Sequence, residues 1–167
     1  SPMSTLKVDT IQGKTTAGTV AMPSGSVIQV QRGEYRTYSN TTSTSYVASG
    51  LSVNITPKFT SSSILVRVII NGSYINSNAK HSSFALYRAS SNIATLSTSG
   101  GYVADFSDEP SYGTYSNVYE HIDSPSSTSQ QTYALYMATS GGTLFLNNYN
   151  VGSTSSLTTI TAVEISQ

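Results

Sequence analysis

The chain has 167 residues, of which 10% are charged, and its eight basic residues balance its eight acidic ones. Soluble domains usually carry roughly 25% charged residues, so this neutral chain lacks the basic surface that binds nucleic acids or anionic membranes. It contains no cysteine, which excludes disulfides and thiolate metal sites. No apolar run approaches the roughly 18 residues of a membrane-spanning helix, and no signal-peptide pattern is visible.

Residues 1–25 differ from the rest and predict an N-terminal arm or stem. Ser1-Pro2 reads as a cloning remnant, and the spacing of Leu6, Val8 and Ile11 is that of a short strand. Small residues, glycine and proline follow, so the segment has too few large side chains for a core of its own. We therefore expect an arm at 1–25 that needs a partner, followed by one head domain at 26–167.

From residue 26 onward, short apolar runs are separated by Gly, Ser, Asn and Pro, which is the pattern of strands and turns. The richness in Ser, Thr, Tyr and Val also favours strands, and no segment has a helical period. About eight strands are predicted, at residues 26–32, 46–55, 64–70, 84–89, 115–122, 131–138, 143–149 and 157–165. Because parallel strands need crossover helices, we expect an all-β fold, an antiparallel β-sandwich of jelly-roll type.

Three of these strands are apolar on both faces, around residues 64–70, 133–137 and 144–149. A sandwich core covers only one face of each sheet, so the second faces need another cover. Symmetric self-association is the simplest cover, and we expect a homotrimer around a three-fold axis. Arg67, which alone interrupts the first run, is expected near that axis, paired with Glu164 or bound to an anion.

Few residues have the types and spacing of a catalytic or metal site. His81 and His121 share no metal-ligand spacing. The acidic cluster of Asp105, Asp108 and Glu109 departs from the EF-hand pattern, which leaves open a solvated loop or a calcium site completed by other loops. No serine lies in a nucleophile motif, and no phosphate-binding glycine loop occurs. The sequence predicts a protein that is not an enzyme and has no cofactor or metal.

The twelve tyrosines are more informative. Loops that combine tyrosine with Asn, Ser and Gly make good recognition surfaces, because the ring gives rigid contact area and the amides give adaptable hydrogen bonds. Sugars suit such loops, since their C–H faces stack on rings while their hydroxyls pair with amides. Tyrosines on predicted strands, such as Tyr87 and Tyr136, are instead expected to be half-buried strand residues. The candidate receptor-binding residues are Tyr102, Asp105, Phe106, Tyr112, Asn148 and Tyr149.

Short motifs spread over nearly the whole chain resemble a family of phage proteins. They are MSTLKVDTIQ at 3–12, ITPK at 55–58, SSILV at 62–66, DSP at 123–125, QTYAL at 131–135 and LTTITAVEI at 157–165. The first resembles the start of small virion proteins from tailed phages of marine bacteria, cyanophages in particular. The others resemble the β-sandwich head domains of phage tail fibres. The same sandwich is similar to the trimeric heads of complement C1q and tumour necrosis factor.

The resemblance implies a homotrimeric virion protein with a jelly-roll head, whose arm binds other virion proteins. The chain lacks the long shaft of a full tail fibre, which favours a fibre tip or short fibre located on the phage tail or capsid surface. We expect this protein to bind a host surface polysaccharide or protein, with a cell-surface glycan as the first choice. The alternative is a capsid or tail decoration protein with a purely structural role. A polysaccharide depolymerase is a third hypothesis, against which the shortage of paired acids speaks.

Overall fold

The computed structural model of the chain describes residues 10–12, 14, 20, 22–77, 80–98, 115–147 and 156–167. Within these residues the protein consists of ten strands and the connections between them. In chain order the strands are β1 (Val27–Tyr35), β2 (Ser39–Thr41), β3 (Val47–Ile55), β4 (Ser63–Ile75), β5 (Ser82–Arg88), β6 (Ser91–Ser97), β7 (Tyr115–Asp123), β8 (Gln131–Thr139), β9 (Leu144–Leu146) and β10 (Thr158–Ile165).

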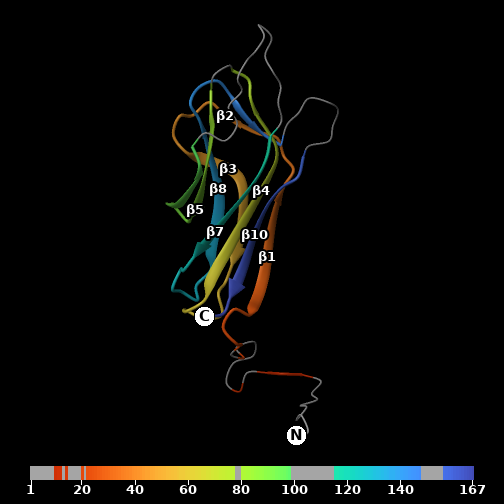
Figure 1. Ribbon diagram of the computed structural model, residues 1–167, viewed down its shortest axis with the longest axis vertical. Coiled ribbons are helices and arrows are strands. Elements are labelled where there is room, and N and C mark those ends of the chain that lie inside the picture. Colours follow the sequence, from red (N-terminus) through yellow and green to blue (C-terminus); the bar gives the residue numbers. More distant parts are fainter. Residues whose placement is uncertain are drawn as a thin grey trace.

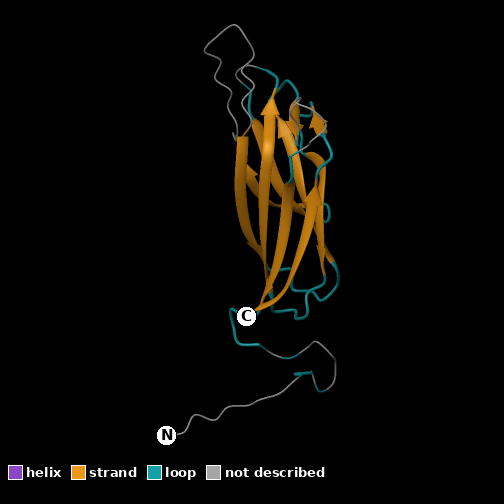
Figure 2. Cartoon of the chain, turned by 90° about the vertical axis from the view of Figure 1, so that its right-hand side faces the viewer, coloured by secondary structure: helices purple, strands orange, loops and turns teal. Residues whose placement is uncertain are grey.

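The strands form two antiparallel sheets packed as layers (Figures 1 and 2). The first sheet has the order β1-β10-β4-β9-β2, and β7 also pairs with β4. The second sheet has the order β3-β8-β5-β6. This arrangement confirms the predicted all-β antiparallel fold with its two-layer packing.

The predicted strands match observed ones, but two observed strands were missed and one predicted strand was too short. β2 has only three residues, all polar, so it gives no apolar alternation. β6 pairs with β5 through irregular register, which disrupts alternation in its sequence. β4 continues five residues beyond the predicted end at Ile70, because its last residues pair with β9 and β7.

The core lies between the sheets and is almost wholly aliphatic. In β4 the alternate residues Ile64, Val66, Val68 and Ile70 are buried, as period-two geometry requires for a strand with one face in the core. The other large, fully buried side chains come mainly from β3, β5, β8 and β9, and include Leu51, Ile55, Phe84, Leu86, Tyr133, Leu135, Met137, Leu144 and Leu146.

One lateral edge of the sandwich closes where β1 meets β3. A Cβ added at Gly33 would lie 2.0 Å from the carbonyl oxygen of Ser52, so only glycine allows the two backbones to approach this closely. The same edge carries Glu164, which is 0% exposed. Its Oε1 accepts hydrogen bonds from Lys58 N and Ser62 Oγ, both at 2.7 Å, and its Oε2 accepts one from Gln29 Nε2 at 2.6 Å. The buried carboxylate therefore holds the β3–β4 connection against β1 and β10.

Polar groups also link the two sheets near the start of β8. Asp123 Oδ2, from β7, accepts a hydrogen bond from Tyr133 Oη at 2.7 Å and forms an ion pair with Arg88 Nη1 at 2.6 Å. Burial raises the pKa of Tyr133, and the hydrogen bond to Asp123 raises it further. The bond to Asp123 also raises the pKa of Arg88. Both raised pKa values keep the Tyr133 phenol and the Arg88 guanidinium protonated beside Asp123 at neutral pH.

The segment that enters β1 is attached to the C-terminal end of the chain, at the base of the head (Figure 1). Gly25 N donates to Ser166 O at 2.8 Å, and Ser166 N donates to Ser26 O at 2.9 Å. Ser166 Oγ donates to Met22 O at 3.1 Å. These bonds hold residues 22–26 against the C-terminal end of the chain at the base of the head.

Candidate functional site: an apolar face on the first sheet

Four strands of the first sheet carry large aliphatic side chains on the surface that faces away from the core. The register places Val30, Val163, Leu65 and Ile122 in one row across β1, β10, β4 and β7. A second row, four residues further along β4, brings Ile69 beside Val118. We call this surface the outer apolar face; its members are Val27, Val30, Leu65, Ile69, Val118, Ile122, Val163 and Ile165.

The exposure of this face is unusual for a folded chain. Val118 and Ile122 are each 61% exposed, Val27 is 57% exposed and Val30 is 54% exposed. Half of the eight large hydrophobic residues exposed in the described part of the chain lie on this one face. Single exposed apolar residues need no explanation, but a contiguous group marks an interaction surface.

Both edge strands of the sheet have inverted polarity. In β7 the half-buried Tyr119 and His121 share the face of the buried Val68 and Val66 opposite them, whereas Val118 and Ile122 point outward. In β1 Gln29 faces the core-side Glu164 while Val30 points outward. A shift of register by one residue would reverse both strands, so their apolar sides are placed outward by the pairing itself.

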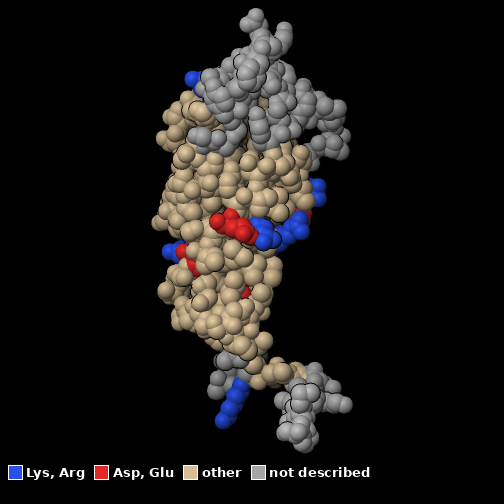
Figure 3. All heavy atoms as spheres, in the orientation of Figure 1, with Lys and Arg blue, Asp and Glu red and all other residues tan. Residues whose placement is uncertain are grey.

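A charged row crosses the outer apolar face between its two apolar rows. Arg67 Nε donates to Glu120 Oε1 at 2.6 Å, and Arg32 pairs with Glu34 at 3.1 Å. The Arg67 and Glu120 side chains are 52% and 45% exposed, so solvent screens the pair and its contribution to stability is about 0–1 kcal/mol. Figure 3 shows the charged side chains as a band across the middle of the head, with uncharged surface on either side.

The charged row corrects one prediction. Arg67 does not pair with Glu164, because Arg67 faces outward from β4 whereas Glu164 is buried on the other side of the sheet. The alternation that buries Ile64 and Val66 also turns Arg67 away from the core.

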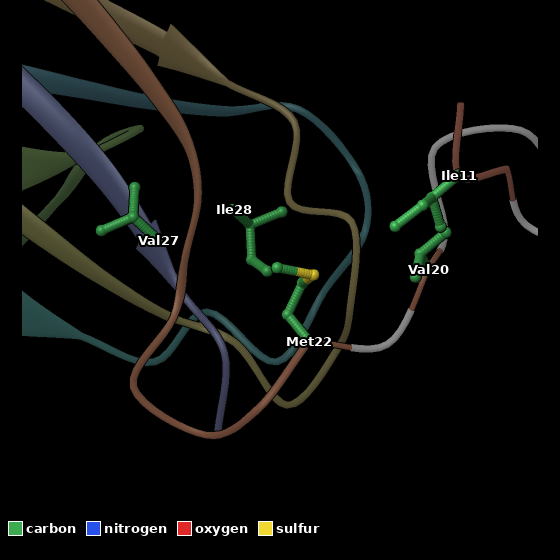
Figure 4. Close-up of a pocket in the computed structure, with 5 residues that line it drawn as sticks. All are labelled: Ile11, Val20, Met22, Val27 and Ile28. Carbon is green, nitrogen blue, oxygen red and sulfur yellow. The ribbon is translucent and has the colours of Figure 1, made fainter. Parts of the chain in front are cut away.

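At the base of the head the outer apolar face adjoins a shallow hollow of about 300 Å³. Its lining is wholly aliphatic and combines Val27 and Ile28 of β1 with Ile11, Val20 and Met22 of the preceding segment. Figure 4 shows Met22 reaching toward Ile28, with Ile11 and Val20 side by side nearby. Ile11 is 69% exposed and is not in a strand, so the predicted short strand does not include it.

All six candidate receptor-binding residues lie outside the described residues: Tyr102, Asp105, Phe106, Tyr112, Asn148 and Tyr149. The described residues that border these segments meet at the C-terminal end of β4. Ser73 of β4 pairs with Tyr115, Tyr74 pairs with Phe145, and Asn71 Nδ2 donates to Leu157 O at 2.8 Å. This end of the head is opposite the base, where residue 22 enters and the C-terminus lies (Figure 1).

The acidic cluster at 105–109 is also outside the described residues, so its two interpretations stay predictions. Among the residues that the structure describes, no group of three or more His, Asp or Glu side chains is arranged to hold a metal ion. The same residues include no helix long and apolar enough to span a membrane.

Comparison with known proteins adds no relative to these observations. No protein-family model matches the chain, and no curated protein matches its sequence. The functional interpretation therefore depends on the geometry of the two sheets and on the motifs of the sequence.

Sequence reasoning found the alternation in β7 but could not say which side faces the core. The signal was present, since Tyr, Asn and His alternate with Val and Ile at residues 117–122. An ordinary assignment would bury Val118 and Ile122, because they are the more apolar set. Only the register with β4 shows that they point outward.

Proposed function

We propose that this protein is a homotrimeric structural protein of a tailed-phage virion, of fibre-tip or short-fibre type, which binds a glycan on the host surface. The outer apolar face carries the proposal. Four of its side chains are more than half exposed, and no described part of the same chain covers them. A second and third copy of the chain would cover them, because the same side chains of all three copies come together around a three-fold axis.

The free energy available from covering this face favours association. Complete burial of a Val or Ile side chain contributes about 1.5–3 kcal/mol. Since Val27, Val30, Val118 and Ile122 are 54–61% exposed, covering them would add roughly 1–2 kcal/mol for each side chain. The charged row would give direction to the contact, because Arg and Glu in one patch pair with the opposite charges of a neighbouring copy.

The strand order supports a jelly-roll form of the sandwich. The connections β2–β3, β3–β4, β4–β5, β6–β7, β7–β8 and β8–β9 all cross from one sheet to the other. Four strands of each sheet follow the orders β1-β10-β4-β7 and β3-β8-β5-β6. Double-sheet jelly rolls are built from eight strands connected in this manner. In this proposal β2 and β9 are short additions beside β4.

The base and the opposite end of the head have separate roles in the proposal. Residues before Met22 leave from the base, where the aliphatic hollow offers a surface for other virion proteins. The candidate glycan-binding residues belong to segments whose borders meet at the other end. The alternative, a decoration protein without a receptor, uses the same oligomer and the same arm but needs no binding at that end.

Two measurements test the proposal. Light scattering after size exclusion should give three times the 17.7 kDa subunit mass for the full chain, and the purified protein should bind host cells. A monodisperse monomer would contradict the trimer. A trimer that binds no host cell would favour the decoration protein, and deletion of residues 3–22 should then still prevent incorporation into the virion.

A further inference from the structure

The second sheet has an outer surface of a different kind, formed by tyrosines instead of aliphatic residues. Phe84 and Leu86 of β5 point into the core, so the intervening Ala85 and the following Tyr87 point outward. In the same way, Leu135 and Met137 of β8 turn Tyr136 outward. Tyr87 and Tyr136 are half-buried, as the sequence predicted, but they lie on the outside of the sandwich.

Three tyrosines form one continuous cluster on this surface. The rings of Tyr87 and Tyr136 are stacked, with centroids 3.7 Å apart and planes inclined by 15°. Tyr46 meets Tyr87 edge to face, with centroids 6.4 Å apart. Ala85 is 0% exposed although it faces outward from its strand, and it lies beside Tyr136 in the register of β5 and β8. The rings are therefore held in fixed positions over a floor of small side chains.

The surroundings of the cluster are polar and uncharged. Among the described residues, the outward side chains of the four strands β3, β8, β5 and β6 include no Asp, Glu, Lys or Arg. The polar residues in the rows of Tyr87 and Tyr136 are Ser52, Asn92 and Thr95, and all three are exposed. The exposed Asn54 and Thr132 pair in the next row. Thr132 Oγ1 donates to Asn54 Oδ1 at 2.7 Å, which holds that amide in place at one side.

We propose that this surface, the tyrosine face, binds an uncharged carbohydrate chain. In the stacked pair Tyr136 keeps one ring face that Tyr87 does not cover, and such a face can pack against the C–H face of a sugar. The surrounding amides and hydroxyls supply donors and acceptors for sugar hydroxyls. The absence of charge decides the class of ligand. A nucleic acid needs cationic side chains for its phosphates, and an acidic polysaccharide needs them for its carboxylates or sulfates.

The tyrosine face and the outer apolar face are on opposite sides of the sandwich. In the proposed oligomer the first sheet is covered by neighbouring copies, which leaves the second sheet facing outward in every subunit. Several copies of a weak sugar site on one particle then act together and raise the overall affinity. The inference rests on the proposed glycan-binding function, but it places the contact on a sheet face and names an uncharged ligand.

An array of immobilised neutral and acidic oligosaccharides, followed by calorimetric titration of the neutral oligosaccharide bound best, tests the inference. The full-length wild type should bind neutral members. Tyr136→Ala should weaken this binding by about tenfold, which corresponds to the loss of one stacked ring. Tyr38→Ala is the matched control, since Tyr38 is 46% exposed but lies just before β2 and against Phe145 of the other sheet, and the binding of this variant should equal that of the wild type.

Ser52→Arg tests the same site without removing a ring. Ser52 is exposed and lies beside Ala134, whose other neighbour in register is Tyr87, so a long side chain there would cover the tyrosine rings. We expect it to abolish binding, whereas Thr60→Arg, in an exposed turn, should not affect it.

The possible outcomes separate a failure of the tyrosine face as the binding site from a failure of the proposed glycan-binding function. Neutral binding that survives both Tyr136→Ala and Ser52→Arg would overturn the tyrosine face as the site. Binding restricted to acidic oligosaccharides would overturn the uncharged ligand. A wild type that binds no oligosaccharide but forms a trimer would overturn both the inference and the glycan receptor while leaving the structural role. Host-cell binding equal in the wild type and both variants would refute the inference and keep the proposed function.

Discussion

The buried carboxylate of Glu164 is expected to be the most sensitive polar group of the fold. It is 0% exposed and accepts hydrogen bonds from Lys58 N, Ser62 Oγ and Gln29 Nε2 at 2.6–2.7 Å, with Phe59 N at 3.3 Å. Hydrogen bonds to a charged group contribute about 1.5–3 kcal/mol each. In the Ala variant, the exposed part of the β3–β4 connection would bind water and so recover part of the lost hydrogen-bond energy. We therefore expect Glu164→Ala to lower the free energy of unfolding by about 3–5 kcal/mol.

Glu164→Gln should lower the free energy of unfolding by less than Glu164→Ala does, but the loss should still be clear because of the hydrogen bonds of Gln29. The Nε2 group of Gln29 donates both to Glu164 Oε2 and to the carbonyl oxygen of Thr56, at 2.7 Å for the latter. An amide NH2 in place of Oε2 would face that donor. If Gln29 then turned its own amide around, it would lose the bond to Thr56. We expect a loss of about 1–3 kcal/mol from the one unsatisfied group.

Thermal unfolding followed by circular dichroism measures both variants. Glu120→Gln is the matched control, because it is the same substitution on the same sheet but at a side chain that is 45% exposed. The free energy of unfolding should there fall by no more than about 1 kcal/mol. Equal, small shifts of the melting temperature for the substitutions at 164 and 120 would refute the assigned role of the buried carboxylate.

Three further predictions test other parts of the structure. The pKa of Tyr133 is raised in the folded state, so the folded protein keeps a proton that the unfolded chain releases above about pH 10, and the free energy of unfolding should fall with rising pH there by up to about 1.4 kcal/mol per pH unit. Tyr133→Phe should remove this pH-dependent component when denaturation is measured from pH 9 to 11. A variant with the same slope as the wild type would contradict the prediction. Gly33→Ala should lower the free energy of unfolding by about 3 kcal/mol, because the added Cβ would meet the Ser52 carbonyl oxygen. If this variant melts at the wild-type temperature, β1 and β3 can move apart at this point and the reasoning is wrong. Arg67→Ala should leave the subunit's unfolding free energy within about 1 kcal/mol while it weakens self-association measured by sedimentation, and loss of the fold would argue against a surface role.

The sequence was sufficient for the strands whose alternation is clean. In β3 the buried Leu51, Val53 and Ile55 alternate with exposed residues, and period-two geometry allows only one orientation for such a segment. The same reasoning placed Leu144 and Leu146 on one face of their strand, and the structure buries both in the core. Strand identity and the composition of the core therefore followed from local pattern.

What the sequence could not provide was the pairing between distant strands. The polarity of β7 depends on its register with β4, which lies some fifty residues earlier, and no local pattern states that register. The role of Glu164 has the same origin, because its partners Gln29 and Lys58 are more than a hundred residues away. The outer apolar face, which joins four strands, exists only after these pairings are made.

Self-association through the outer apolar face is the central claim, and the solution mass of two matched variants tests it most directly. Ile122→Asp places a carboxylate on the 61% exposed β7 side of the face, whereas Val47→Asp makes the same kind of change at a 36% exposed valine of β3, in the other sheet. Light scattering should give a folded monomer of 17.7 kDa for Ile122→Asp and three times that mass for both the wild type and Val47→Asp. An Ile122→Asp protein with the same mass as the wild type would contradict the claim.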